Sequence, residues 1–551
     1  MEKRLTRRDL LRAGAAAGLG LGAGLLETPQ PAQAGSQPAR KHPNILFIMV
    51  DEMRCDVMGC AGHPVVRTPN LDALARQGIR FANSYSVAPV CCPARRSAFT
   101  GRYAHVHGVT TNGLPANPGQ ILITSILKHY GYATAVSGKL HFNPENWDYD
   151  FDQFWSYGAE GPGQLESYPQ YLQRKYGSPG KWPKKPASCP WPDDPLGKDL
   201  GEFLYPKEDF ESFWITDRSV DFLRSRQGSD QPWFLFTSYL IPHSPYTTPQ
   251  PYHSMYPPDS FSVPQLPPNA ADLRAARPGM AKRSIIADEA MLRAITAQYL
   301  GHVTNVDDNV GRLLAELEKL GMAGDTIIVF TADHGNMLGD RGRMFKGVMY
   351  EGSSHIPHLM RAAKNAPHAQ RFNTGRVVEE IVETVDLLPT LLEMTDLPVP
   401  EAGIQGRSLL KLVLGEDKDW KNRAFAALAT AMIRTPEFKL IDNRKEGPGR
   451  YELYDMRNDP KEERDLSGEA QYKDLVADLA SRIAAWSKET PPPIQIAGMP
   501  TPSYAEPLDP KLREELMQRI KKRAQSKASW TPPGKTDHSG APRQPKAKAK
   551  A

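Results

Sequence analysis

The stretch PNILFIMVDEMR, residues 43–54, decides the fold. After Asn44 it is an uninterrupted apolar run that ends in two acids, Asp51 and Glu52. A short run that is apolar on both faces is typical of a strand buried inside a parallel sheet. The run therefore predicts such a strand, with Asp51 and Glu52 at its carboxyl end.

Three later stretches repeat this pattern. They are YATAVSGKLHF at residues 132–142, PWFLFTSYLIPHSPY at 232–246 and DTIIVFTADHGNMLG at 325–339. The polar side chains that follow their apolar runs are Lys139, His141, His243, Asp333 and His334. Because ligands of α/β sheets bind beyond the carboxyl ends of the strands, we expect all these side chains to meet at one site.

Segments with helical patterning separate the strands. Examples are TPNLDALARQGIRF at 68–81, ILITSILKHYG at 121–131 and NVDDNVGRLLAELEKLGM at 305–322. The first is expected to be capped by Thr68 or Asn70 and to place Leu71, Leu74 and Ile79 on one face. Strands that alternate with helices predict an α/β fold, a large and mostly parallel sheet sandwiched by helices.

The pattern changes near Phe425. FAALATAMIRTPEFKLID and RYELYDMRNDPKEERDL predict antiparallel strands, and YKDLVADLASRIAAWSK predicts a helix. We therefore expect a catalytic domain over 35–424 and a smaller C-terminal α+β domain over 425–490. The tail, 491–551, is Pro-rich and basic and is expected to be partly disordered. Its amphipathic segment PKLREELMQRIKKRA packs either on the body or on a neighbouring subunit, which leaves a homo-oligomer open.

Residues 1–34 predict a cleavable signal peptide of the twin-arginine type. Arg7 and Arg8 precede a short apolar region rich in Gly and Ala, and AQA at Ala32–Ala34 fits a cleavage site. The prediction implies that a twin-arginine translocase exports the protein to the periplasm or out of a bacterial cell. The alternative is a basic amphipathic start that stays in the cytosol.

The composition argues against several classes of function. The net charge of +5 is concentrated at the two ends, since the leader carries five basic and three acidic residues and the last eleven residues carry four basic ones. A nearly neutral body argues against nucleic acid as a partner. No stretch of the body reaches the roughly 18 apolar residues of a membrane span, so we expect none in the mature protein.

Five cysteines are too few for a disulfide scaffold. They are Cys55, Cys60, Cys91, Cys92 and Cys189. Cys55 and Cys60 either form a disulfide or are small buried residues, and the sequence leaves both open.

Two of the strand ends carry groups that bind metal ions. Asp51 and Glu52 follow one strand, and Asp333 and His334 follow another. Carboxylate oxygens favour Ca²⁺, Mg²⁺ or Mn²⁺, and a histidine shifts the preference toward transition metals. Each acid alone would equally well cap the turn after its strand. Two such pairs together favour a divalent metal site.

The same edge is expected to gather cations. They are Arg95, Lys139, His141, His243 and Lys346, with Arg102 as a further candidate. So much positive charge beside a metal suits a tetrahedral oxyanion, either sulfate or phosphate. Lys346 comes from a glycine-rich stretch, ADHGNMLGDRGRMFKG, and by itself would be interpreted as a solvated surface lysine.

The stretch VCCPARRSAFTGRY, residues 90–103, resembles the Cys-x-Pro-x-Arg signature and its Thr-Gly-Arg extension in type I sulfatases of the alkaline phosphatase superfamily. PNILFIMVDE, TPNLDALA, GKLH, PHSP, ADHG, Lys346 and the ELYD...NDP segment also resemble that family, in its order, over about residues 43–490. The resemblance implies an alkaline-phosphatase-like fold. It also implies that a formylglycine-generating enzyme converts Cys91 to formylglycine (3-oxoalanine), while Cys92 remains a packed side chain.

The resemblance further implies a role for each site residue. The metal ligands would be Asp51, Asp333, His334 and the formylglycine from Cys91, with Glu52 where the family commonly has Asp. We expect Ca²⁺ first and Mn²⁺ second, although His334 stands where many members of the family have Asn. Arg95 would hold the aldehyde hydrate, Lys139 and Lys346 the sulfate oxygens, His141 the second hydroxyl and His243 the leaving oxygen.

In the mechanism that the resemblance implies, one hydroxyl of the aldehyde hydrate attacks sulfur. The other then loses its proton and expels sulfate, which regenerates the aldehyde. The chain would therefore be an exported sulfatase acting on a small-molecule or carbohydrate sulfate ester. One alternative is a formylglycine-dependent phosphonate monoester or phosphodiester hydrolase, and a second is an unmodified anion-binding protein. The GKLH stretch favours the sulfatase.

The substrate itself stays open among carbohydrate, aryl and alkyl sulfates. The segment 142–213 is rich in Trp, Tyr, Pro and Gly. We expect it to form loops over the site that offer aromatic rings to a sugar or aryl group. The alternative is that these rings only pack the loops together.

Overall fold

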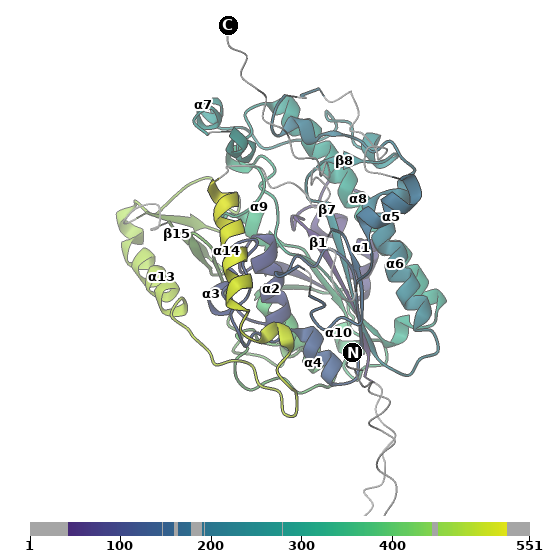
Figure 1. Ribbon diagram of the computed structural model, residues 1–551. Coiled ribbons are helices and arrows are strands. Elements are labelled where there is room, and N and C mark those ends of the chain that lie inside the picture. Colours follow the sequence, from purple (N-terminus) through teal and green to yellow (C-terminus); the bar gives the residue numbers. More distant parts are fainter. Residues whose placement is uncertain are drawn as a thin grey trace, which may run out of the picture. The chain divides into compact units, whose positions relative to one another are not determined.

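The computed structural model of the protein describes residues 42–145, 147–158, 164–177, 190–191, 193–277, 279–443 and 450–525. The predicted signal peptide, Cys189 and the tail beyond Gln525 lie outside these residues. A ten-stranded sheet forms the centre of the described part, and a separate four-stranded antiparallel sheet follows it in the chain (Figure 1). This confirms the predicted α/β fold with a smaller C-terminal α+β part.

The four predicted strands lie side by side in the middle of the large sheet. Strand β1 (Asn44–Asp51) pairs in parallel with β7 (Trp233–Pro242) on one side and with β9 (Thr326–Ala332) on the other. Strand β3 (Ala133–Gly138) is parallel to β7. All four are buried along their whole length, as apolar runs without alternation require. Their carboxyl ends therefore meet at one edge of the sheet.

The outer strands make the sheet mixed. Beyond β3 lie β4 (Gln153–Ser156) and β5 (Gln164–Ser167), which are parallel to it. Beyond β9 lies the antiparallel strand β11 (His358–Arg361). The last strands on that side are β2 (Ile79–Tyr85), β10 (His355–Ile356) and β12 (Val377–Glu383).

Helices cover both faces of the large sheet, and each face has its own hydrophobic core. Leu46, Ile48 and Val50 of β1 enter one core, while the residues between them enter the other, because successive side chains of a strand point to opposite faces. The first core is covered by α1 (Pro69–Gln77), α6 (Glu211–Ser225) and α8 (Glu289–Lys319). The second is covered by α2 (Cys91–Thr100), α4 (Ile123–His129), α11 (Leu387–Met394) and α12 (Leu409–Val413).

Shorter elements complete this part of the chain. They are α3 (Ala104–His107), α5 (Tyr168–Tyr176), β6 (Gly201–Glu202), β8 (Thr247–Thr248), α7 (Ala270–Ala275), α9 (Glu351–Ser354) and α10 (Ala369–Phe372). No helix in the described ranges is both long and apolar enough to cross a membrane.

Helix α1 differs from its prediction at both ends. Thr68 stands at the N-cap, but its hydroxyl accepts the amide of Gly59 at 2.8 Å and does not cap the helix. Ile79 does not belong to the helix face, because α1 ends at Gln77 and Ile79 begins β2. Gly78 allows this sharp change, since a Cβ there would lie 2.2 Å from the carbonyl oxygen of Met360. The spacing of apolar residues continues from α1 into β2, so it could not reveal the turn between them. The close packing of Gly78 against the backbone of Met360 explains this turn.

The C-terminal sheet is an antiparallel meander covered by one helix. Its strands are β13 (Ala424–Ala427), β14 (Ala431–Arg434), β15 (Phe438–Asp442) and β16 (Tyr451–Asp455). Helix α13 (Lys473–Trp486) packs on it through Leu479, Ile483 and Trp486, whose ring stacks on Phe425 with centroids 4.8 Å apart. Helix α14 (Pro510–Gln525) follows (Figure 1).

A set of buried charges joins this sheet to the large one. We call it the junction cluster, and it consists of Glu351, His355, Lys439 and Glu462. The Nζ of Lys439, fully buried, lies 2.8 Å from a carboxylate oxygen of Glu351 and 2.8 Å from one of Glu462. His355 donates its Nδ1 hydrogen to Glu351 at 2.9 Å and its Nε2 hydrogen to the carbonyl of Ala82 at 2.7 Å. Because both partners can only accept, His355 is a charged imidazolium.

Candidate active site

The carboxyl ends of the central strands bring the predicted acids together. Asp51 ends β1 and Asp333 follows β9, the neighbouring strand, and both side chains are buried. Around them gather Glu52, Cys91, Arg95, Lys139, His243, His334 and Lys346. We call these nine residues the strand-end cluster.

Cys91 enters the cluster from a buried helix. It is the first residue of α2, and all ten residues of this helix are buried. Its Sγ lies 3.1 Å from Nε2 of His334 and 3.6 Å from Oδ1 of Asp51. Arg95, one helical turn later, lies on the same face of the helix. The spacing Cys-x-x-x-Arg thus delivers both side chains to the same edge of the sheet.

Arg95 ties three strand ends together. Its Nε donates to Oδ2 of Asp333 at 2.8 Å, and its Nη1 donates to the carbonyl of Lys139 at 2.7 Å and to Oγ of Ser238 at 2.8 Å. Its Nη2 lies 3.5 Å from Oδ2 of Asp51 and has no hydrogen-bond partner among the described residues. Burial opposes the charge, but Asp333 and Asp51 outweigh it and raise the pKa of Arg95.

The donor set fits a divalent metal ion. Ligand atoms of Asp51, Cys91, Asp333 and His334 all lie within 4.8 Å of one another. Nδ1 of His334 faces the carbonyl of Gly335 at 3.0 Å, and a carbonyl can only accept, so Nδ1 carries the hydrogen. Its Nε2 therefore offers a lone pair to the cluster. A hydrogen bond to the other ring nitrogen is the usual means of orienting a metal-binding histidine.

Glu52 has different neighbours from Asp51. Its Oε2 lies 2.7 Å from Nζ of Lys346 and 3.3 Å from Nε2 of His243, and its Oε1 accepts from Nδ2 of Asn336 at 3.0 Å. Nδ1 of His243 donates to the carbonyl of Ser244 at 2.5 Å. A neutral His243 therefore turns the lone pair of its Nε2 toward Glu52.

Asn336 closes the loop that carries Lys346. Its Oδ1 accepts from the amides of Leu338 at 2.8 Å and Phe345 at 3.0 Å, while its Nδ2 donates to Glu52. The side chain is fully buried. This loop brings Lys346 back over the strand ends, so Lys346 is not the solvated surface lysine that its sequence context alone would suggest.

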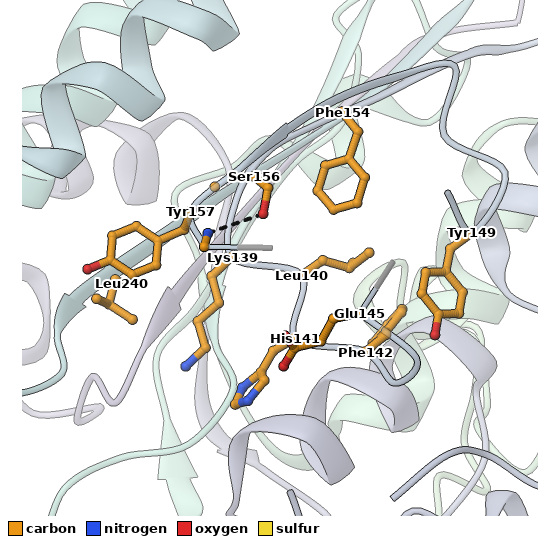
Figure 2. Close-up of a pocket in the computed structure, with 12 residues that line it drawn as sticks. Lys139, Leu140, His141, Phe142, Glu145, Tyr149, Phe154, Ser156, Tyr157 and Leu240 are labelled. Carbon is orange, nitrogen blue, oxygen red and sulfur yellow. Dashed lines mark hydrogen bonds between the residues drawn. The ribbon is translucent and has the colours of Figure 1, made fainter. Parts of the chain in front are cut away.

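Lys139 and His141 lie between the cluster and a neighbouring pocket. Nζ of Lys139 pairs with Oδ2 of Asp51, while His141, at a backbone φ of 61°, is partly exposed. Both line a pocket whose other walls are mostly apolar and aromatic. Figure 2 shows the ends of these two side chains close together, on the side of the pocket opposite Phe154.

Burial and cations decide the protonation states. Burial, with Lys346 nearby, lowers the pKa of His243 well below its usual range, and burial with Lys139 does the same for His141. Burial also lowers the pKa of His334. Burial opposes ionisation of Asp51, but Lys139, His243 and Arg95 outweigh it and hold its pKa well below the usual value.

The thiol of Cys91 behaves differently from the acids around it. Burial, together with the charge of Asp51, raises the pKa of Cys91 to about 12. The protein groups by themselves therefore keep an unconverted Cys91 protonated at neutral pH. A protonated thiol is a weak nucleophile.

Other sequence candidates lie elsewhere or have other surroundings. Arg102 is not at the site: its guanidinium donates to the carbonyls of Pro491 and Pro492 at 2.8 and 2.9 Å. Cys92 is buried, with its Sγ 3.7 Å from Nδ2 of Asn143. Cys55 and Cys60 are free thiols and form no disulfide.

Sequence reasoning missed three buried polar residues near the site. They are Asn336, Ser238 and Glu211. Burial raises the pKa of Glu211 to about 7, and the hydroxyl of Tyr157 and the charge of Lys139 act against that shift. Only Asn336 had a signal in the sequence, since it follows the ADHG stretch directly.

Comparisons with known proteins agree on one family. The sulfatase family model matches residues 43–397, and the model of the N-sulphoglucosamine sulphohydrolase C-terminal region matches residues 339–489. An arylsulfatase of Clostridium perfringens is 30% identical over 458 residues, which cover 79% of this chain and 92% of that protein. An N-acetylglucosamine-6-O-sulfatase of Bacteroides thetaiotaomicron is 28% identical, covering 82% of this chain and 87% of that protein.

Solved structures include a relative of another specificity. The phosphonate monoester hydrolase of Silicibacter pomeroyi superimposes with a TM-score of 0.67 at 26% identity. The match covers 81% of this chain and 95% of that one.

Proposed function

Since this chain belongs to the sulfatase family of the alkaline phosphatase superfamily and is a sulfuric ester hydrolase, we propose that it cleaves its ester with a formylglycine made from Cys91. The position of Cys91 carries the proposal. Its Sγ is surrounded by Asp51, Asp333, His334 and Arg95, and burial keeps the thiol itself protonated. Conversion to the aldehyde hydrate replaces this weak nucleophile with an oxygen nucleophile.

The cations around Cys91 have separate roles in this proposal. Arg95 points an N–H without a hydrogen-bond partner among the described residues toward the space beside Asp51, where it would hold the hydrate. Lys139 and Lys346 approach from two sides and would bind the sulfate oxygens, replacing their contacts with Asp51 and Glu52. Fixed cations of this kind stabilise the charge that develops on the transferring group.

His243 would protonate the leaving oxygen. Its Nε2 lies 3.3 Å from Oε2 of Glu52, and an incoming sulfate ester adds a negative charge that favours the imidazolium. His141, neutral and beside Lys139, would accept the proton of the second hydroxyl when sulfate leaves. His141 thus starts in the state that its task requires, and His243 would reach its protonated state when the ester binds.

A divalent metal would be held by Asp51, Asp333, His334 and the converted Cys91, and would supply Lewis-acid stabilisation of the sulfate oxygens. Glu52 is not part of this set of four: its carboxylate bonds Lys346 and Asn336, and it groups with Asp51 and His243. The oxygen-rich set with one histidine suits Ca²⁺ first and Mn²⁺ second.

Maturation and export belong to the same proposal. A formylglycine-generating enzyme would convert Cys91, and the twin-arginine leader would then carry the folded protein out of a bacterial cytosol, to the periplasm or beyond. Replacing Arg7 and Arg8 with lysines should leave active protein in the cytosolic fraction. Activity that still reaches the periplasm or medium would refute this route.

The rival function is hydrolysis of phosphonate monoesters or phosphodiesters, as the similarity to the phosphonate monoester hydrolase suggests. A diester carries one negative charge, as a sulfate monoester does, so contacts and not charge must separate the two. Lys139 and His141 would crowd the second ester group of a diester. We therefore expect a higher kcat/KM for an aryl sulfate than for the matched aryl phosphodiester.

Lys139→Ala tests this expectation. The change should lower kcat/KM for the sulfate by about 10²-fold, typical of removing one fixed electrostatic partner, and should narrow the preference for sulfate. Lys319→Ala, at an exposed lysine, is the control and should change neither rate. A wild type that prefers the diester, or a ratio that Lys139→Ala leaves unchanged, would favour the rival function.

A further inference from the structure

The stretch of chain between α13 and α14 packs against the second face of the large sheet. Residues 491–505, which we call the strap, follow residue 489, the last that the family models match, and pass α4 on the way to α14 (Figure 1). The first two carbonyls of the strap accept from the guanidinium of Arg102 at 2.8 and 2.9 Å, and its last carbonyl accepts from the amide of Gly119 at 2.7 Å. Ile494, 2% exposed, lies in the second core. The strap is therefore fixed to the body at both of its ends.

Near its end the strap places Tyr504 beside the start of α4. The amide of Leu122, the N-cap residue of α4, donates to the Tyr504 hydroxyl at 3.1 Å. That hydroxyl also contacts Oγ of Ser125, whose own hydrogen goes to Oδ2 of Asp150 at 2.5 Å. Because Ser125 uses its hydrogen on the carboxylate, its oxygen accepts the hydrogen of Tyr504. The Tyr504 hydroxyl thus links the start of α4, through Ser125, to Asp150.

Asp150 belongs to a turn in a costly backbone conformation. Tyr149 and Asp150 have φ values of 51° and 63°, in the left-handed region that residues with a Cβ rarely adopt. Such a turn persists only where the surrounding contacts hold it. The carbonyl of Tyr149 accepts from the hydroxyl of Thr124 at 2.8 Å, and that of Asp150 accepts from a second threonine, Thr134, at 2.7 Å. The ring of Tyr504 adds a further support, with its centroid 5.4 Å from that of Tyr149.

The same turn carries one wall of the pocket beside Lys139. Tyr149 lines this pocket together with Phe142, and the two rings meet edge to face at 5.3 Å. The guanidinium of Arg96 packs on both rings, 4.2 Å from the centroid of Phe142 and 5.2 Å from that of Tyr149. Figure 2 shows the two rings on one side of the pocket, away from Lys139. A shift of the turn would therefore change the shape of this aromatic wall.

We propose that Tyr504 is a positioning residue for substrate binding, because it holds the Tyr149 turn and thereby shapes the aromatic wall for the alcohol part of an aryl sulfate. The inference rests on the proposed function for the position of the sulfate. Tyr504 is not among the described residues that line the pocket, so it acts through Tyr149. A wall fixed in advance loses little conformational entropy when an aromatic group binds. Loss of Tyr504 should therefore raise KM and leave kcat little changed, since the groups that act on sulfur stay in place.

Steady-state kinetics with 2-naphthyl sulfate and the converted, metal-loaded enzyme test the proposal. Tyr504→Ala should raise KM roughly tenfold and keep kcat within about twofold, because the ring contact and the hydroxyl bridge are both lost. Tyr504→Phe keeps the ring and disturbs the fold less, and it should raise KM about threefold. A variant that is only partly folded would instead lose kcat with its KM unchanged.

Tyr472→Ala is the matched control. Tyr472 is half-buried, as Tyr504 is, and its ring contacts that of Phe438 on the C-terminal sheet, with centroids 5.9 Å apart. It is not among the described residues that line the pocket. The change should therefore leave the KM for 2-naphthyl sulfate as it is in the wild type.

A double-mutant cycle shows whether Tyr504 acts through Tyr149. In a Tyr149→Ala background, Tyr504→Ala should raise KM less than about twofold, because the ring that it supports is already gone. Additive effects of the two changes, or a KM that stays unchanged in the folded Tyr504 variants, would overturn this inference alone. Absence of any turnover by the converted wild type would overturn the proposed function together with the inference.

Discussion

The strand-end cluster and the junction cluster both combine acids, lysines and histidines, yet their histidines differ in protonation state. In the junction cluster Lys439 lies between two glutamates and His355 is an imidazolium. In the strand-end cluster burial and nearby lysines lower the pKa values of His243 and His334, and they do the same for His141 beside it.

One stretch of chain joins the two clusters. It begins at Asp333, carries Lys346 and ends at Glu351, whose amide also donates to Glu462 at 2.8 Å. The junction cluster therefore anchors one end of the segment whose other end belongs to the site. Buried charge by itself therefore does not mark an active site. The distinguishing feature is a group of neutral histidines beside cations that a ligand can recruit.

The largest effect should come from Asp333→Asn. The change removes one proposed metal ligand and the partner of Arg95, so turnover should fall by about 10³-fold or more, and bound metal should be lost. Steady-state rates and elemental analysis of the purified protein measure the two effects. The junction counterpart, Glu462→Gln, should keep turnover within about tenfold of the wild type. Full metal content in Asp333→Asn would contradict the assignment.

Lys346 and Lys439 form a matched pair, since each lies within 2.8 Å of a glutamate, with Lys346 partly buried and Lys439 fully buried. Lys346→Met should lower kcat/KM by about 10²-fold, because a cation proposed to bind the sulfate is lost. The fold should tolerate the change, since burial already raises the pKa of Glu52 and allows it to take up a proton. Equal kcat/KM values for Lys346→Met and the wild type would show that Lys346 does not bind the sulfate.

Lys439→Met should have the opposite outcome, with a large loss of stability and little change in kcat/KM. It leaves Glu351 and Glu462 buried without their shared cation, and breaking such a contact costs about 3–5 kcal/mol of unfolding free energy. Denaturant unfolding measures this loss, and kcat/KM of the folded fraction should change less than tenfold. A stable Lys439→Met protein with strongly reduced turnover would mean that the junction cluster acts in catalysis.

The smallest effect concerns pH. Burial opposes the charge on His355, but the neighbouring Cys55 and Glu351 outweigh it and raise its pKa well above the usual range. Its stabilising effect is therefore complete below about pH 6.5 and is lost as the pH rises through the folded-state pKa. Burial likewise opposes ionisation of Glu351, but Lys439 and His355 hold its pKa well below the usual range. That contribution is present above about pH 4.3 and is lost as the pH falls.

The two contributions overlap between about pH 4.3 and 6.5. The difference in unfolding free energy between wild type and His355→Gln should be largest in this window and should shrink toward alkaline pH. Denaturant unfolding at several pH values measures it. A difference that grows with rising pH would show that His355 is neutral in the folded protein.

The sequence predicted most of the strand-end cluster because its residues follow apolar runs. One of these residues, Asp51, is the last of its strand, and three follow their strands directly: Lys139, His243 and Asp333. Parallel neighbouring strands place their carboxyl ends at one edge of the sheet, which brings these side chains together. Cys91 and Arg95 were identified only by the resemblance of their motif. Once α2 is formed, their spacing explains why both reach the same edge.

Other features depend on contacts between distant parts of the chain. Ser238 lies within an apolar strand, and its hydroxyl becomes part of the site only because Arg95 donates a hydrogen bond to it. Asn336 looked like one more loop residue, although it holds the Lys346 loop closed. The break between α1 and β2 is set by the backbone of β11 against Gly78. Local patterns do not predict these contacts, although the place of Asn336 directly after the ADHG stretch was a signal that it lies near the site.

The most direct test of the central claim is mass spectrometry of the peptide from Phe81 to Arg95 of the mature protein, which trypsin releases with both cysteines. Fragmentation assigns the modification to one position. We predict an aldehyde oxygen in place of sulfur at residue 91, with Cys92 still a thiol. An unmodified Cys91 in fully active enzyme, or an aldehyde at position 92, would contradict the account.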